Sequence, residues 1–112
     1  MLSIFTSLVV FTALAVARTV EYRWDVTWVN ANPDGQFDRP VIGINGKWPC
    51  PTIEASVGDE VKIVLTNKLG NETTSLHFHG LFQKGTNQMD GPSSVTQCPI
   101  PPDQTFTYRF VS

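Results

Sequence analysis

The sequence lacks the local patterns that mark most catalytic sites. G-x-S-x-G, C-x-x-C, H-E-x-x-H and P-loop patterns are all missing, so no motif supports a serine hydrolase, a dithiol redox site, a zinc peptidase or a phosphate-binding loop. Charged residues make up 16% of the chain and the net charge is −2. There is no basic run and no interleaving of basic and aromatic residues, so we expect no nucleic-acid partner.

Helical periodicity, internal repeats and low-complexity tracts are also missing. Short alternating segments separated by turn signals take their place, and this pattern is typical of an all-β sandwich or barrel. The chain has 112 residues, enough for at most one small domain. We predict strands over residues 19–29, 41–44, 52–55, 60–66, 75–80 and 105–111, with a long loop over residues 81–94.

The one long apolar run lies at the start of the chain, over residues 4–16. It is shorter than the roughly 20 residues that a membrane-spanning helix needs, and it ends in the A-x-A cleavage pattern of residues 15–17. No Lys or Arg precedes the run, although a secretory signal usually begins with a basic residue. A buried N-terminal strand and a membrane anchor are the alternatives to a signal. We predict a secretory signal over residues 1–17 and a single domain over residues 18–112. The protein would then enter the secretory pathway and be extracellular or at the cell surface.

Secretion permits disulfides, and the chain has only Cys50 and Cys98. The two could pair with each other, or either could pair with a cysteine outside the chain. Asn71-Glu72-Thr73 is a glycosylation sequon in a polar loop, so we expect Asn71 to carry a glycan.

The only two histidines stand two residues apart, at His77 and His79. On a strand, residues two apart share a face at about 7 Å, so both imidazoles would point the same way while Leu76 and Phe78 face the core. Imidazole binds copper, zinc, iron and nickel, but most such pairs are surface or hydrogen-bonded histidines. A blue-copper site with Cys98 and Met89 is disfavoured because no histidine follows Cys98.

Several ordered segments together are more specific than the pair alone. Residues 39–49 (RPVIGINGKWP), 57–59 (VGD), 77–83 (HFHGLFQ), 85–91 (GTNQMDG) and 97–100 (QCPI) closely resemble the first copper-binding region of multicopper oxidases. The residues of these segments are most similar to those of the fungal iron-oxidising branch of that family.

This resemblance implies a cupredoxin-like (plastocyanin-like) Greek-key β-sandwich or barrel, here incomplete at its C-terminal end. His77 matches the ligand of the type 2 copper, and His79 matches a ligand of one of the paired type 3 coppers. Asp90 matches an acid near this trinuclear cluster that helps to move protons. Cys98 matches a cysteine that bridges to a later domain, and Cys50 has no clear counterpart.

The resemblance also implies what a longer parent protein does. It would reduce O2 to water at the trinuclear copper cluster and oxidise Fe(II) for iron uptake. Its partners would be the later cupredoxin domains, O2, Fe(II) or a phenolic reductant, and an iron permease. The family's other histidine motifs are not in these 112 residues, so we expect an N-terminal fragment that is inactive alone. The alternatives are a fragment of a laccase-type phenol oxidase and a stand-alone module that binds copper weakly.

Overall fold

A computed structural model describes residues 17–112 of the chain. Apart from Ala17, the predicted signal segment lies outside the described residues. The described part contains four strands and one short 3-10 helix, in the order β1 Thr19–Ala31, β2 Arg39–Ile44, β3 Glu60–Asn67, η1 Asn87–Met89 and β4 Thr105–Val111. Within residues 17–112, no helix has the length and apolar character needed to cross a membrane.

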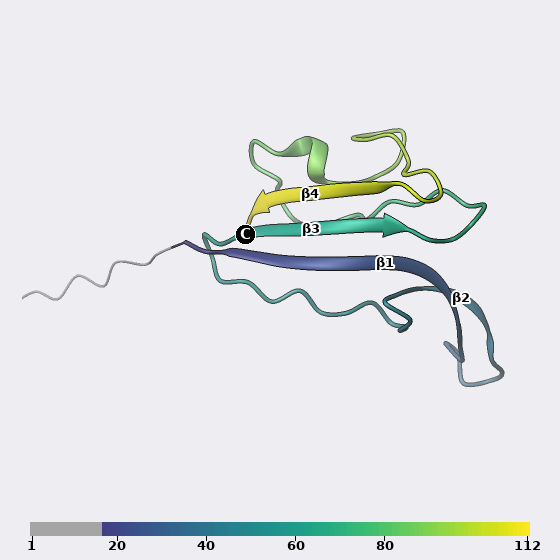
Figure 1. Ribbon diagram of the computed structural model, residues 1–112. Helices are drawn as coiled ribbons and strands as arrows, with labels where there is room; N and C mark the ends of the chain where they lie inside the picture. Colours follow the sequence, from purple (N-terminus) through teal and green to yellow (C-terminus); the bar gives the residue numbers. More distant parts are fainter. Residues whose placement is uncertain (1–16) are drawn as a thin grey trace, which may run out of the picture.

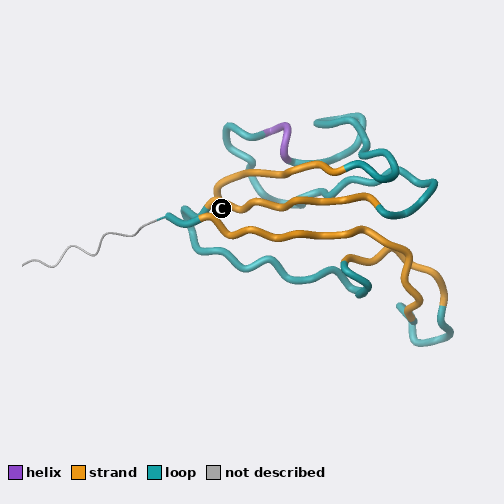
Figure 2. The backbone as a smooth tube through the Cα atoms, in the orientation of Figure 1, coloured by secondary structure: helices purple, strands orange, loops and turns teal. Residues whose placement is uncertain are grey.

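The four strands form one sheet in the order β2-β1-β3-β4 (Figure 1). β1 runs parallel to β3 along its first half and antiparallel to β2 along its second half. β3 and β4 form an antiparallel pair from Glu60↔Val111 to Thr66↔Thr105. The long connection between β3 and β4 carries both histidines, and it is almost entirely loop, with η1 as its only helical turn (Figure 2).

The core lies against one face of β3 and β4. Burial alternates along β3 because successive side chains of a strand point to opposite faces. The inward residues Val61, Ile63 and Leu65 are at most 1% exposed, and the phenol of Tyr108 on β4 is fully buried beside them. The connection between β3 and β4 adds Leu69, Phe78 and Ile100 to this cluster, so it is packed against the sheet.

Four of the six predicted strands are confirmed, and two are wrong. Residues 52–55 form no strand, because the main-chain groups of Glu54 bond to a side chain. Its N–H donates to the Tyr22 hydroxyl at 2.9 Å, and that hydroxyl donates to the Glu54 carbonyl at 3.1 Å. Residues 75–80 also form no strand, and this segment holds the histidines.

Candidate metal centre

The histidine segment is held by single bonds to separate groups rather than by a neighbouring strand. Thr74, just before the segment, makes an isolated β-bridge to Ile100. The Leu76 N–H donates to the Tyr108 hydroxyl at 2.9 Å, and the Phe78 N–H donates to the Asp90 carbonyl at 3.1 Å. These partners satisfy the main chain without a ladder, so the predicted strand is not needed to keep the segment extended.

Phe78 fixes the segment to the sheet. Its ring meets the rings of Tyr108 and Phe110 edge-on, with centroids 5.4 Å and 4.6 Å apart. Edge-to-face aromatic pairs add to the free energy of burial itself. Phe78 is 7% exposed while both flanking histidines are exposed. The predicted alternation of core-facing and outward residues is therefore confirmed, although the strand is not.

The two imidazoles lie side by side on the outer surface. Their ring centroids are 5.6 Å apart and their planes make an angle of 65°. This separation is less than the roughly 7 Å between equivalent positions on a strand. Two nitrogen donors at this spacing suit either one metal ion or two neighbouring ones.

His77 has one ring nitrogen committed to the protein. Its Nδ1 lies 2.9 Å from the carbonyl oxygen of Asp90, and a carbonyl only accepts, so Nδ1 carries the proton. We assign the tautomer from this bond. The Nε2 lone pair is then free, and a main-chain carbonyl bonded to the other nitrogen is the usual support of a metal-binding imidazole. His77 could therefore bind a metal ion through Nε2.

Asp90 lies beside His77 because Gly91 allows the two segments to touch. A Cβ on Gly91 would stand 1.7 Å from the carbonyl oxygen of Leu76, and the residue has a φ of +98°. Only glycine combines that backbone conformation with so close an approach. The result is one Asp90 carbonyl that accepts from both Phe78 and His77, with the carboxylate Oδ1 3.6 Å from His77 Nδ1.

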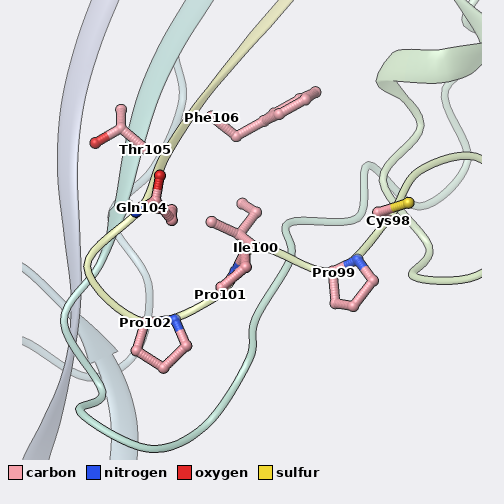
Figure 3. A pocket seen from close by; sticks show the side chains of 8 residues that line it. All are labelled: Cys98, Pro99, Ile100, Pro101, Pro102, Gln104, Thr105 and Phe106. Atoms are coloured by element: carbon pink, nitrogen blue, oxygen red, sulfur yellow. The ribbon is translucent and has the colours of Figure 1, made fainter.

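The predicted site residues thus fall into two groups. His77, His79 and Asp90 come together on one surface, whereas Asn71 is exposed in the loop after β3 and both cysteines are exposed and unpaired within residues 17–112. Cys98 lies at the edge of a surface pocket of about 530 Å³ with a proline-rich lining (Figure 3).

Sequence reasoning missed the positioning roles of Gly91 and Tyr108, and the Asp-Gly pair at 90–91 was the available signal.

The donor set fits copper but does not complete a site. Imidazole nitrogen is a good ligand for copper, and two imidazoles are presented together. Among residues 17–112, no group of three or more His, Cys, Asp and Glu side chains is placed to hold a metal ion. Any metal held here would need further ligands from elsewhere.

A family profile described as "Multicopper oxidase" matches residues 25–112. The chain belongs to the multicopper oxidase family. This membership confirms the predicted family and implies copper as cofactor.

The similar proteins include fungal iron oxidases. The iron transport multicopper oxidase fetC of Epichloe festucae is 66% identical over 97 residues, which cover 87% of this chain and 16% of that protein. The iron transport multicopper oxidase FET3 of Saccharomyces cerevisiae is 48% identical over 110 residues, covering 98% of this chain and 17% of that protein. The chain therefore spans about a sixth of the length of these curated relatives, and the predicted similarity to the iron-oxidising branch is confirmed.

Solved structures confirm the cupredoxin-like fold class. The crystal structure of Fet3p, described as a multicopper oxidase that functions in iron import, matches with a TM-score of 0.78 and 49% identity. It covers 83% of this chain and 18% of the Fet3p chain. The laccase from Botrytis aclada matches with a TM-score of 0.80 and 41% identity, over 87% of this chain and 18% of its own.

Proposed function

We propose that this chain supplies the first two ligands of a trinuclear copper cluster that reduces O2 to water. His77 would bind the type 2 copper through Nε2, and His79 would bind one of the type 3 coppers. The observation that carries the proposal is the pair of adjacent, outward-facing imidazoles, one already fixed by the Asp90 carbonyl at 2.9 Å. The remaining ligands would come from residues outside these 112.

The chain's own residues have three tasks in this proposal. Phe78 and Tyr108 hold the segment on the sheet, so that the imidazoles keep their positions as charge changes at the site. The Asp90 carbonyl orients His77, and the Asp90 carboxylate Oδ1 stands 3.6 Å from Nδ1, where it can hold a proton and pass it on. Copper, when bound, supplies the one-electron chemistry of O2.

For the whole protein we propose oxidation of Fe(II) during iron uptake. The support is the function for which the similar proteins are named, iron transport for fetC and FET3 and iron import for Fet3p. The protein would be secreted and lie at the cell surface or outside the cell, glycosylated at Asn71. Its partners would be the later cupredoxin domains, joined through a disulfide at Cys98, and an iron permease.

Oxidation of phenols is the second candidate. The Botrytis aclada laccase superposes as well as Fet3p does, with TM-scores of 0.80 and 0.78. Steady-state O2 uptake with Fe(II) and with a phenol separates the two. A kcat/KM that favours the phenol would replace the iron assignment while leaving the copper ligands unchanged.

The ligand assignment is tested in the secreted full-length protein that carries this chain. We expect His77→Ala to remove the type 2 copper signal in electron paramagnetic resonance. We expect His79→Ala to lower the copper content while keeping that signal. In both variants O2 uptake should fall by more than roughly 10–100-fold. A decrease of that size is typical when a group hydrogen-bonded to a metal ligand is removed and the ligand itself remains.

Two further variants complete the test. Asp90→Asn keeps the main-chain carbonyl, so copper should remain bound while O2 reduction slows. Gln88→Ala, at an exposed position two residues before Asp90, is the matched control and should change nothing. Copper content and O2 uptake that are normal in both histidine variants would overturn the proposal. Histidine-dependent copper binding by the 112-residue chain alone, without activity of the full-length protein, would favour the stand-alone copper module.

A further inference from the structure

Outside the candidate metal centre, a buried carboxylate binds the first residue of the predicted domain. Asp59 is 4% exposed and is the only carboxylate buried to this degree within residues 17–112. Its Oδ1 accepts from the main-chain N–H of Arg18 at 3.1 Å. Its Oδ2 accepts from the Ser56 N–H at 3.0 Å and the Arg18 Nε at 3.2 Å. A buried carboxylate needs such partners, and two of the three bonds come from Arg18.

The same carboxylate lies where three strands meet. The Glu60 N–H, at the start of β3, donates to the Arg18 carbonyl at 2.9 Å, and the Ser112 N–H, just after β4, donates to the Asp59 carbonyl at 3.0 Å. Figure 1 shows the start of β1, the start of β3 and the end of β4 side by side at this corner of the sheet. Arg18 thus precedes β1, bonds directly to the start of β3, and is linked to the end of β4 only through Asp59.

Arg18 is also the residue after the predicted cleavage pattern. Residues 15–17 read Ala-Val-Ala, which is an A-x-A signal. Ala17 and Arg18 are both exposed. Hydrolysis adds water across the bond between them, leaving a carboxylate on Ala17 and a free amino group on Arg18.

We propose that Asp59 is the binding site for the α-ammonium group that removal of the signal segment creates at Arg18. Before cleavage, Oδ1 accepts a neutral amide hydrogen from Arg18. After cleavage, the same nitrogen carries a positive charge, and charge-assisted hydrogen bonds are roughly twice as strong as neutral ones. Processing would therefore tighten the junction of β1, β3 and β4. This inference is independent of the copper assignment.

Other charged groups at this corner also act on the new ammonium group. The guanidinium of Arg18 also faces Asp59 and, as a like charge, opposes the ammonium. Glu60 is the other carboxylate nearby, and it is held by the Thr19 hydroxyl at 3.0 Å and by Arg109 at 3.1 Å. Lys62 on β3 is paired with Glu21 at 2.8 Å. The carboxylate of Asp59 is thus the one in hydrogen-bond contact with the nitrogen that becomes the new amino group.

The measurable consequence is the titration of the amino terminus. A carboxylate in contact raises the pKa of an α-amino group above its ordinary value of about 7.7–8.0. Amine acylation needs the neutral form, so each unit of increase slows the reaction about tenfold at neutral pH. We expect the amino terminus of the folded protein to react about 3–10-fold more slowly than that of the same protein unfolded.

The experiment uses the secreted protein, with its N-terminal peptide identified by mass spectrometry. Acylation at the α-amino group is measured across a pH series, in the native protein and in guanidinium chloride. Asp59→Asn should return the native pKa to the ordinary range. Asp38→Asn removes a carboxylate of the same type at an exposed position and should leave the pKa raised.

Two results would overturn the inference. One is a mature protein that does not begin at Arg18. The other is an α-amino pKa that is the same in native and unfolded wild-type protein, a comparison that stands even where Asp59→Asn is not secreted. Fe(II) oxidation plays no part in either measurement, so the copper assignment stands or falls separately.

Discussion

Gly91→Ala is the substitution that most directly tests how the candidate metal centre is assembled. The new Cβ would lie 1.7 Å from the Leu76 carbonyl oxygen and 3.1 Å from the Cα of His77. Both neighbours are main-chain atoms that cannot rotate away, so the segment with Asp90 and the segment with His77 must separate by more than an ångström. The hydrogen bond between them, 2.9 Å from His77 Nδ1 to the Asp90 carbonyl, would be broken.

The cost of this change has two parts that a second variant separates. A non-glycine residue in the left-handed region costs roughly 1–2 kcal/mol, and Gly85→Ala should cost only this, because Gly85 has a φ of +76° with no atom within 4 Å of its Cβ position. Gly91→Ala adds the clash and the lost bonds. We expect it to lower the free energy of unfolding by about 3–5 kcal/mol.

The assay follows copper and stability in the full-length protein. Gly91→Ala should lose type 2 copper and melt earlier, whereas Gly85→Ala should keep copper and show only the smaller loss of stability. Equal effects of the two substitutions on copper and on the unfolding free energy would refute the argument that close contact at Gly91 positions His77.

Two further predictions concern single groups. Tyr108→Phe leaves the Leu76 N–H without the hydroxyl that accepts from it at 2.9 Å, so the free energy of unfolding should fall by about 1–3 kcal/mol in chemical denaturation; an unchanged value would show that water replaces the hydroxyl. The donors from Ser56 and Arg18 lower the pKa of the Asp59 carboxyl, so this group stabilises the folded state above its unfolded pKa of about 3.9. That stabilisation is lost as the pH falls through the lower folded pKa. Asp59→Asn should therefore flatten the acid limb of the stability curve, and a curve parallel to that of the wild type would contradict the linkage.

Residue patterns predicted most of the sheet because its signals are local. β1, β3 and β4 alternate apolar and polar residues, and each is found within two residues of the predicted bounds. The strand over residues 75–80 failed for a reason that local patterns do not contain. Its alternation is real, yet its main-chain partners are the Tyr108 hydroxyl and the Asp90 carbonyl rather than the successive N–H and C=O groups of a strand.

The candidate site was predictable in its chemistry but not in its support. The His77 and His79 pair is visible in the sequence, and the ordered segments around it pointed to copper. The bond between His77 and the Asp90 carbonyl depends on the close approach at Gly91, which no spacing rule gives. Tyr108 carries no sequence signal for its role, which depends only on its tertiary contact with the Leu76 N–H.

The two proposed ligands are not equivalent, and the difference bears on how the proposed cluster would assemble. His77 has its Nδ1 bonded to the Asp90 carbonyl, so its ring plane and tautomer are fixed by this chain before any metal arrives. His79 makes no hydrogen bond through its ring within residues 17–112, and it contacts His77 edge-on. Its orientation is thus left to the metal and to the groups that complete the site. In the proposed cluster, a fixed His77 beside an adjustable His79 would let the site form between this surface and a second one, because one imidazole would set the position while the other accommodates the fit.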